Sequence, residues 1–286
     1  MWSKYWMIIS NLWELETMKV EETNKRAEKL AEQLQGNLIV SCQAYPGEAL
    51  YGSDMMVRMA LAAVNGGAAG IRSNSPQDVA AIKEAIRIPV IGIWKKEYPG
   101  SNVYITPTLA DVEVMIAAGA DMVALDATMQ PRPSGEMLEY IVNVIKTKYD
   151  IPLMADISTY EEGIRAAELG FDFISTTLSG YTPYSVQQKE PDMELIKRLA
   201  AAVITPIIAE GRIHTPEQAE EALRNGAFSV VVGTAITRPH TLTSSFVSKI
   251  KGEQVPVQAA MSGSVIPVIA QNQDGNEPAS MGEALS

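Results

Sequence analysis

The chain has 286 residues, 47% of them hydrophobic, and a formal net charge of −11 at pH 7. This length and hydrophobic content suit an α/β barrel, and the acidic charge argues against a general nucleic-acid-binding protein, which normally carries a basic face. The single cysteine, Cys42, excludes a disulfide within the chain. We expect it to be a buried structural thiol in a cytoplasmic protein.

The two ends of the chain differ from its centre. Residues 1–36 are predicted to form an N-terminal extension that holds an amphipathic helix, in the charged segment "MKVEETNKRAEKLAEQLQ". The apolar run "WMII" before it is too short for a signal peptide or for a membrane span, which needs about 20 residues. Residues 252–286 are rich in Gly, Ser, Pro, Gln and Asn. They are predicted to be a flexible polar tail.

Between residues 37 and 251, short apolar runs alternate with segments of helical period. The runs are nearly continuous in apolar residues, as expected for parallel strands that are covered on both faces. Eight strands are predicted, at 37–43, 68–73, 89–95, 122–128, 152–158, 171–178, 205–211 and 228–235.

Three of the intervening segments carry clear helix signals, at 108–119, 158–170 and 214–226. Each contains Ser or Thr near its start, followed by acidic residues, and each ends at a glycine that leads directly into the next strand. Eight strand-then-helix units predict a (β/α)₈ TIM barrel. A doubly wound open sheet is the alternative, and it is less favoured because the motif GxGxxG does not follow the first strand.

Polar side chains stand at most of the predicted strand ends, which in such barrels form the active-site face. A single buried charge at a strand end is explained equally well by a structural ion pair. Several that converge on one opening instead indicate proton-transfer chemistry on an anionic substrate. They are Gln43, Arg72, Lys95 with Lys96, Asp126, Asp156, Glu210 and, in the loop after the last strand, Arg238.

The last two predicted strands end in glycine-containing sequences that suit a phosphate group. Barrel enzymes often bind phosphate through backbone N–H groups after strands 7 and 8, where glycine allows close approach. The predicted phosphate site consists of Gly211, Arg212, Gly233 and Thr234. The alternative is that these glycines only make tight turns between strand and helix.

Motifs at nearly all strand ends closely resemble those of the N-acylglucosamine-6-phosphate 2-epimerase family, also called the N-acetylmannosamine-6-phosphate 2-epimerase family. They include "NLIVSCQA", "PVIGIWK", "MVALDAT", "MADIST", "STTLSGYTPYS", "IIAEGRIHTPEQA" and "VVVGTAITRP", in order over residues 37–250. The resemblance implies a (β/α)₈ barrel that interconverts N-acetylmannosamine 6-phosphate and N-acetylglucosamine 6-phosphate. It also implies a role in sialic acid and amino sugar catabolism, with no metal or organic cofactor.

The resemblance also implies roles for individual residues. Lys95 and Glu210 match the catalytic lysine and glutamate of the family, and the substrate-binding positions match Gln43, Arg72, Asp156 and Arg238. Trp94 departs from the smaller aliphatic residue that is usual there. Because side chains alternate along a strand, Trp94 and Lys96 are expected to point away from the side on which Lys95 lies.

The mechanism expected from these residues is removal of the proton at C2 of the open-chain sugar by Lys95, followed by reprotonation on the other face. The division of roles between Lys95 and Glu210 stays open, as do acyl-group specificity and the direction of flux. Two alternatives remain: a class I aldolase, which forms a Schiff base on a barrel lysine, and a non-catalytic sugar-phosphate-binding protein. The oligomeric state is also open, and a homodimer that exchanges the polar tail is one option.

Overall fold

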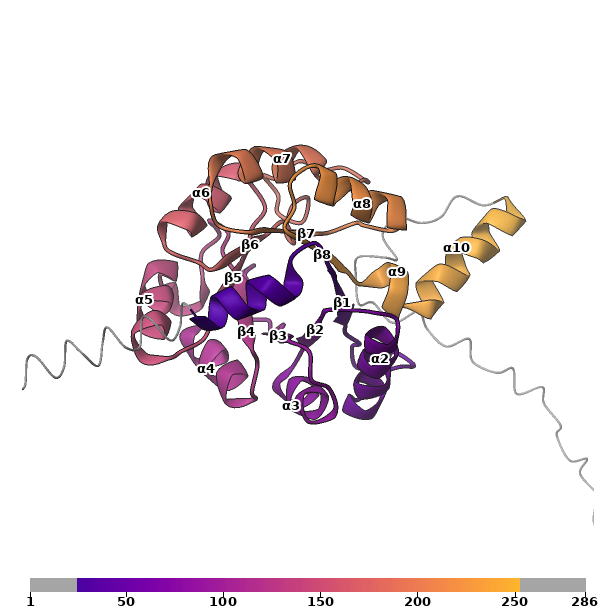
Figure 1. Cartoon of the computed structure of the whole chain (residues 1–286), viewed down its shortest axis with the longest axis horizontal. Helices are drawn as coiled ribbons and strands as arrows, with labels where there is room; N and C mark the ends of the chain where they lie inside the picture. Colours follow the sequence, from indigo (N-terminus) through magenta and orange to yellow (C-terminus); the bar gives the residue numbers. More distant parts are fainter. Residues whose placement is uncertain (1–24, 253–286) are drawn as a thin grey trace, which may run out of the picture.

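The computed structural model describes residues 25–252. Its centre is a closed barrel of eight parallel strands in sequence order, which confirms the predicted (β/α)₈ fold (Figure 1). Each predicted run overlaps one strand, and only β2 extends past its run, by one residue. The strands are β1 Leu38–Cys42, β2 Gly70–Asn74, β3 Val90–Ile93, β4 Met122–Asp126, β5 Leu153–Asp156, β6 Phe173–Ser175, β7 Ile207–Glu210 and β8 Ser229–Val232.

Helices lie around the barrel and connect successive strands, and two more helices follow the last strand. They are α2 Ser53–Asn65, α3 Pro76–Ala85, α4 Leu109–Ala117, α5 Leu138–Lys148, α6 Tyr160–Glu168, α7 Met193–Ala202, α8 Pro216–Arg224, α9 Thr234–Thr237 and α10 Pro239–Lys251, with a 3₁₀ turn, η1, at Pro133–Gly135. The predicted caps are confirmed, because Thr108, Thr159 and Thr215 each form a capping box with the residue three positions later. None of the helices within residues 25–252 is long and apolar enough to cross a membrane.

Strand alternation divides the core into two clusters. Met122 and Ala124 of β4 belong to the cluster inside the barrel, whereas Val123 and Leu125 pack between the strands and the surrounding helices. The same alternation turns Asp126, the last residue of β4, toward the barrel axis. Inward-facing positions at the carboxyl ends of the strands therefore line one opening of the barrel.

A helix at residues 25–34 covers the opposite opening, as the indigo segment in Figure 1 shows. Leu30 and Leu34 are buried in the cluster inside the barrel, and Leu34 lies against Gly70 at the beginning of β2. Residues 25–36, predicted above to precede the barrel, thus contribute to its core. Residues 1–24 and the predicted tail from 253 onward lie outside the described residues.

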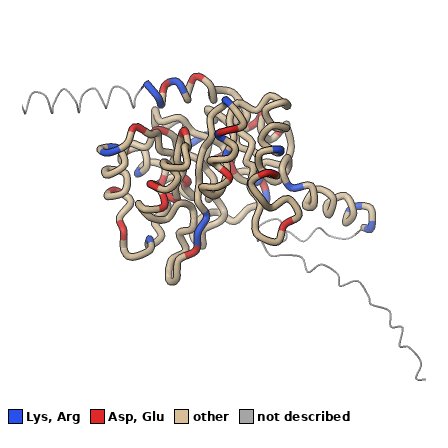
Figure 2. Tube along the Cα trace, turned by 90° about the horizontal axis from the view of Figure 1, so that it is seen from below, with Lys and Arg blue, Asp and Glu red and all other residues tan. Residues whose placement is uncertain are grey.

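The last helix does not pack on the barrel wall. After β8 the chain makes the short helix α9, and α10 then projects away from the barrel (Figure 1). Along one side of α10, Leu242, Phe246 and Ile250 are 40%, 70% and 83% exposed. Elsewhere, acidic and basic residues are interspersed over the described chain (Figure 2).

Candidate active site

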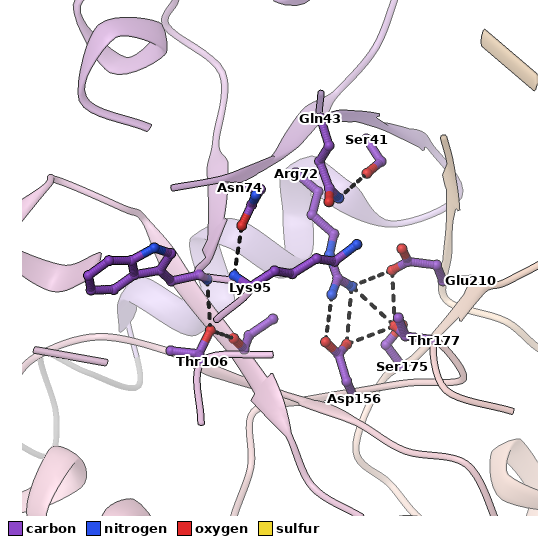
Figure 3. Close-up of polar contacts among 12 residues, drawn as sticks. Ser41, Gln43, Arg72, Asn74, Lys95, Thr106, Asp156, Ser175, Thr177 and Glu210 are labelled. Atoms are coloured by element: carbon purple, nitrogen blue, oxygen red, sulfur yellow. Dashed lines mark hydrogen bonds and ion pairs between the residues drawn. The ribbon is translucent and has the colours of Figure 1, made fainter. Parts of the chain in front are cut away.

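Charged side chains from three strands and from the segment after β3 meet at the carboxyl-end opening of the barrel (Figure 3). Arg72 comes from β2, Asp156 from β5 and Glu210 from β7, while Lys95 lies two residues beyond β3. Figure 3 shows the Lys95 side chain extending toward the side on which Arg72 and Glu210 lie. Four residues that the sequence placed at strand ends are thus brought to one place.

Arg72 is the hub of this cluster, and its side chain is only 1% exposed. It forms a two-pronged pair with Asp156, at 3.1 and 2.5 Å, and also forms an ion pair with Glu210. Burial is the largest influence on the Arg72 pKa and lowers it, but the two carboxylates together raise the pKa above its usual value. The guanidinium therefore stays charged, as a buried cation with two anionic partners can.

Glu210 is held at the end of β7 by its backbone as well as by its side chain. The Thr176 hydroxyl donates to the Glu210 carbonyl at 2.9 Å and accepts from the Glu210 N–H at 3.1 Å. Burial raises the pKa of the Glu210 carboxyl, and Asp156 raises it further, while Arg72 opposes both. A carboxyl group placed between these opposing influences is suited to exchanging a proton with a ligand.

Thr177 was not identified from the sequence, although its hydroxyl lies between both carboxylates. Its Oγ1 is 2.7 Å from Asp156 Oδ1 and 3.0 Å from Glu210 Oε2, and it lies 3.1 Å from an Arg72 nitrogen. It belongs to the "STTLSGYTPYS" segment, and the sequence does not show which of the two adjacent threonines faces the barrel axis. The structure shows that Phe173 faces inward, and alternation from Phe173 through Ser175 then makes Thr177 the inward-facing threonine.

Lys95 is positioned by neighbouring loops. Its backbone N–H donates to Asn74 Oδ1 at 2.7 Å, and its backbone pairs with Ile105 in an isolated antiparallel bridge. Its Nζ donates to the Tyr45 hydroxyl at 2.7 Å. Tyr45 was also missed in the sequence, because it lies in the loop after β1 and has no periodic pattern around it.

The two neighbours of Lys95 point elsewhere, as strand alternation predicts. Lys96 pairs with Asp111 of α4 at 3.0 Å, and its Nζ lies 4.5 Å from the centre of the Trp94 ring. Trp94 itself packs against the cluster between strands and helices. The prediction that only the middle residue of this trio faces the opening is confirmed.

The other predicted substrate-binding residues border the cluster without joining it. Gln43 donates to Ser41 Oγ at 2.6 Å, and its buried Oε1 has no hydrogen-bond partner within residues 25–252. Arg238 pairs with Glu48 at 3.1 Å and lies 5.2 Å from the centre of the Tyr45 ring. Tyr45 is thus next to both Lys95 and Arg238.

The predicted phosphate-binding residues follow β7 and β8, but the Arg212 side chain points away from the others. Gly211 has φ of +109°, a conformation that only glycine adopts readily, and Gly233 precedes Thr234 at the start of α9. Arg212 turns toward the loop after β6, where its Nε donates to the Glu190 carbonyl at 3.0 Å. Its guanidinium lies 5.5 Å from the centre of the Tyr181 ring.

Two further titratable groups, one buried and one partly buried, lie near the cluster. Burial raises the pKa of Asp126 to about 6, although its Oδ1 accepts from the backbone and hydroxyl of Thr128 at 2.9 and 2.7 Å. Its Oδ2 has no partner among the described residues. Tyr104 has its pKa raised, mainly by burial and then by Tyr45, Asp126 and Asp156, so its phenol remains a hydrogen-bond donor.

The arrangement combines an amine, a carboxyl of raised pKa and a buried guanidinium at one opening. Such groups can remove and return a proton beside a carbonyl whose developing negative charge the cation stabilises. Within residues 25–252, no group of three or more His, Cys, Asp or Glu residues is placed to hold a metal ion.

Comparison with known proteins identifies the family. The NanE family model, described as "Putative N-acetylmannosamine-6-phosphate epimerase", matches residues 56–252. A protein from Caldanaerobacter subterraneus subsp. tengcongensis is 56% identical over 223 residues, which are 78% of this chain and 94% of its own length. Its name is "Putative N-acetylmannosamine-6-phosphate 2-epimerase". A Clostridium perfringens relative with the same name is 51% identical over 76% of this chain and 98% of its own.

Solved structures agree with this result. The N-acetylmannosamine-6-phosphate 2-epimerase from Clostridium perfringens matches with a TM-score of 0.75 and 50% identity, over 77% of this chain and 95% of that one. A thiamine phosphate pyrophosphorylase from Pyrococcus furiosus matches with a TM-score of 0.52 and 17% identity, over 82% of this chain and 100% of its own, and shares the fold alone. On the family match and these identities, the chain belongs to the NanE family of N-acetylmannosamine-6-phosphate epimerases.

Proposed function

We propose that this protein interconverts N-acetylmannosamine 6-phosphate and N-acetylglucosamine 6-phosphate, as a cytoplasmic enzyme of sialic acid and amino sugar catabolism. The observation that carries the proposal is the position of Lys95 beside the Arg72–Glu210 pair in a chain of the NanE family. Lys95 is close enough to Glu210 to lower the pKa of that carboxyl. The two groups needed for proton transfer thus face one region of the opening.

The reaction breaks and re-forms one C–H bond. In the open-chain sugar, the C2 hydrogen lies next to the aldehyde and is acidic, and its removal gives an enolate. We assign this removal to the amine of Lys95. Return of a proton to the opposite face of C2 gives the epimer. The net reaction consumes no other reactant, because the proton that leaves is replaced by one proton.

Glu210 and Arg72 supply the other requirements. Opening and closing the sugar ring needs a group that accepts and returns the proton of the C1 hydroxyl, and the raised pKa of Glu210 suits that task. Arg72 places a fixed positive charge where the enolate oxygen would develop negative charge. The alternative assignment, in which Glu210 returns the proton to C2, uses the same geometry.

The remaining predicted site residues are assigned to binding. The unpartnered Oε1 of Gln43 is available to a hydroxyl or amide N–H of the ligand, and we assign Asp156 and Arg238 to the sugar and its acyl group. We assign the 6-phosphate to backbone N–H groups at Gly211, Gly233 and Thr234. Arg212 would join the phosphate only by leaving the Glu190 carbonyl.

The experiment that tests the function is proton NMR of the purified protein with N-acetylmannosamine 6-phosphate in deuterated water. The expected result is appearance of N-acetylglucosamine 6-phosphate with deuterium at C2. Saturable binding without turnover would instead identify a sugar-phosphate-binding protein. A covalent adduct on Lys95 after borohydride treatment with substrate would identify Schiff-base chemistry, and hence an aldolase.

We also propose that the protein is a homodimer, with α10 at the interface. Leu242, Phe246 and Ile250 recur every four residues and form one apolar side of a helix that projects from its own barrel (Figure 1). A second copy offers the same side of the same helix, which suits a symmetric contact.

Light scattering after size exclusion should show a dimer for the wild type, and a monomer for the double variant Phe246→Ser with Ile250→Ser. Ile204→Ser, at a fully exposed position before β7, is the control.

A further inference from the structure

The hydroxyl of Thr177 has more neighbours than it has protons to give. Its Oγ1 lies 2.7 Å from Asp156 Oδ1, 3.0 Å from Glu210 Oε2, 3.1 Å from Arg72 and 2.8 Å from Ser175 Oγ. A hydroxyl has one proton to donate and two lone pairs with which to accept. Arg72 can only donate, so it uses one lone pair, and the two ionised carboxylates can only accept.

The two carboxylates therefore compete for one proton. When the Thr177 hydroxyl donates to Glu210, Asp156 keeps its two bonds from Arg72. When the hydroxyl donates to Asp156, Glu210 keeps its ion pair with Arg72 and loses the Thr177 bond. The choice requires only rotation of one O–H bond, with no movement of a heavy atom. Because Asp156 is fully buried and Glu210 is only 14% exposed, each such bond has a strong effect on the charge of its acceptor.

We propose that Thr177 is a positioning residue whose single hydroxyl proton follows the protonation state of Glu210. With Glu210 ionised, Thr177 donates to it. With Glu210 protonated, the carboxyl donates to Thr177 Oγ1 and the Thr177 proton turns to Asp156 Oδ1. Glu210 thus has a hydrogen-bond partner in both of its states. This inference rests on the proposed role of Glu210 in the epimerase reaction.

The charged and titratable groups around Glu210 are consistent with this role. Arg72 from β2 and Lys95 after β3 favour its ionised form, whereas Asp156 from β5 opposes ionisation. Tyr181, in the loop after β6, has its own pKa raised mainly by burial and further by Glu210, against the effect of Arg212. The hydrogen bond from Thr177 lowers the Glu210 pKa against the effect of burial. Loss of that hydroxyl therefore leaves Glu210 harder to ionise.

The test compares Thr177→Val, which keeps the shape but removes the hydroxyl, with Thr177→Ser, which keeps the hydroxyl. For Thr177→Val we expect kcat to fall about 10–100-fold, the size of effect of one hydrogen bond to a charged group, with KM changed less than about threefold. The acidic limb of the kcat/KM profile should move to higher pH, since ionised Glu210 becomes less available. Thr177→Ser should stay within about threefold of the wild type.

Two controls separate loss of this hydroxyl from general damage to the protein. Thr147→Val removes an exposed hydroxyl on α5 that donates to the Asn143 carbonyl, and it should leave activity and pH profile unchanged. If Thr177→Val does not fold, Thr177→Ala takes its place, with Thr177→Ser still expected to behave like the wild type. A hydroxyl-free variant with wild-type kcat and an unmoved acidic limb would overturn the inference, as would a Thr177→Ser variant as impaired as Thr177→Val.

The same assay distinguishes failure of this inference from failure of the proposed function. Wild-type protein without turnover, or a fully active Glu210→Gln variant, would remove the proposed role of Glu210 itself. An inactive Glu210→Gln variant together with a fully active Thr177→Val variant would leave the proposed function in place and reject only the positioning role of the Thr177 hydroxyl.

Discussion

The amine of Lys95 donates a hydrogen bond to the hydroxyl of Tyr45, 2.7 Å away. Glu210 is meanwhile paired with Arg72. The two groups proposed for proton transfer are therefore each held by a partner of their own. A tyrosine hydroxyl positions the Lys95 amine without forming the tight ion pair that a carboxylate would form with it.

Replacement of Lys95 by alanine should sharply reduce both epimerisation and deuterium incorporation at C2, because the neighbouring amine of Lys96 pairs with Asp111 instead. We expect turnover to fall by about 10²–10⁴-fold, the contribution of a general base. Lys96→Ala is the matched control, since that side chain pairs with Asp111 on the outer side. Deuterium uptake by Lys95→Ala at the wild-type rate would show that another group is the base.

Replacement of Arg72 by methionine should destabilise the fold, because it leaves the buried Asp156 and the partly buried Glu210 without their cation. We expect the free energy of unfolding to fall by about 3–5 kcal/mol, as measured by urea denaturation. The control is Arg224→Ala, which breaks an exposed pair with Glu220 and should change stability by less than about 1 kcal/mol. Equal effects of the two substitutions would contradict the hub role of Arg72.

Asp126 should make the protein less stable as pH rises. Its pKa of about 6 in the folded protein exceeds the value of about 3.9 in an unfolded chain, so the folded state binds more protons between these values. The free energy of unfolding should therefore fall through the window from about pH 4 to 6, and the loss should be complete above it.

The variant that tests this effect is Asp126→Asn, which cannot ionise and keeps an oxygen for the two bonds from Thr128. Relative to the wild type, it should gain about 2–3 kcal/mol between pH 4 and pH 7.5, measured by denaturation at both values. A stability difference between variant and wild type that is the same at both pH values would show that Asp126 ionises normally.

Gly211→Ala should impair substrate binding more than it impairs the fold. A side chain at φ of +109° is strained, at about 1–3 kcal/mol, whereas the added methyl group would make only ordinary contacts, 3.6–3.7 Å, with the carbonyl oxygens of Thr177 and Thr176. We expect KM to rise several-fold. Gly119→Ala has a similar φ of +88° after α4, at the other end of the barrel, and controls for backbone strain alone. An equal KM for both variants would argue against phosphate binding at Gly211.

Much of the fold could be predicted because its signals are local. Thr108, Thr159 and Thr215 begin helices through bonds to residues three positions away, and strand alternation correctly separated Lys95 from Trp94 and Lys96. The segment at residues 25–34 was harder to place, because its charged sequence suits a surface helix. Only closure of the barrel creates the opening that Leu30 and Leu34 fill.

The sequence by itself determined the barrel, the order of its strands and the set of polar residues at their ends, because periodicity and caps depend on near neighbours in the chain. The tertiary structure alone decided which of those residues meet. Arg72 finds Asp156 and Glu210 across 84 and 138 residues of chain, Thr177 joins all three, and Arg212 turns to the loop after β6. Such contacts depend on barrel register, loop path and rotamer, which local sequence does not encode.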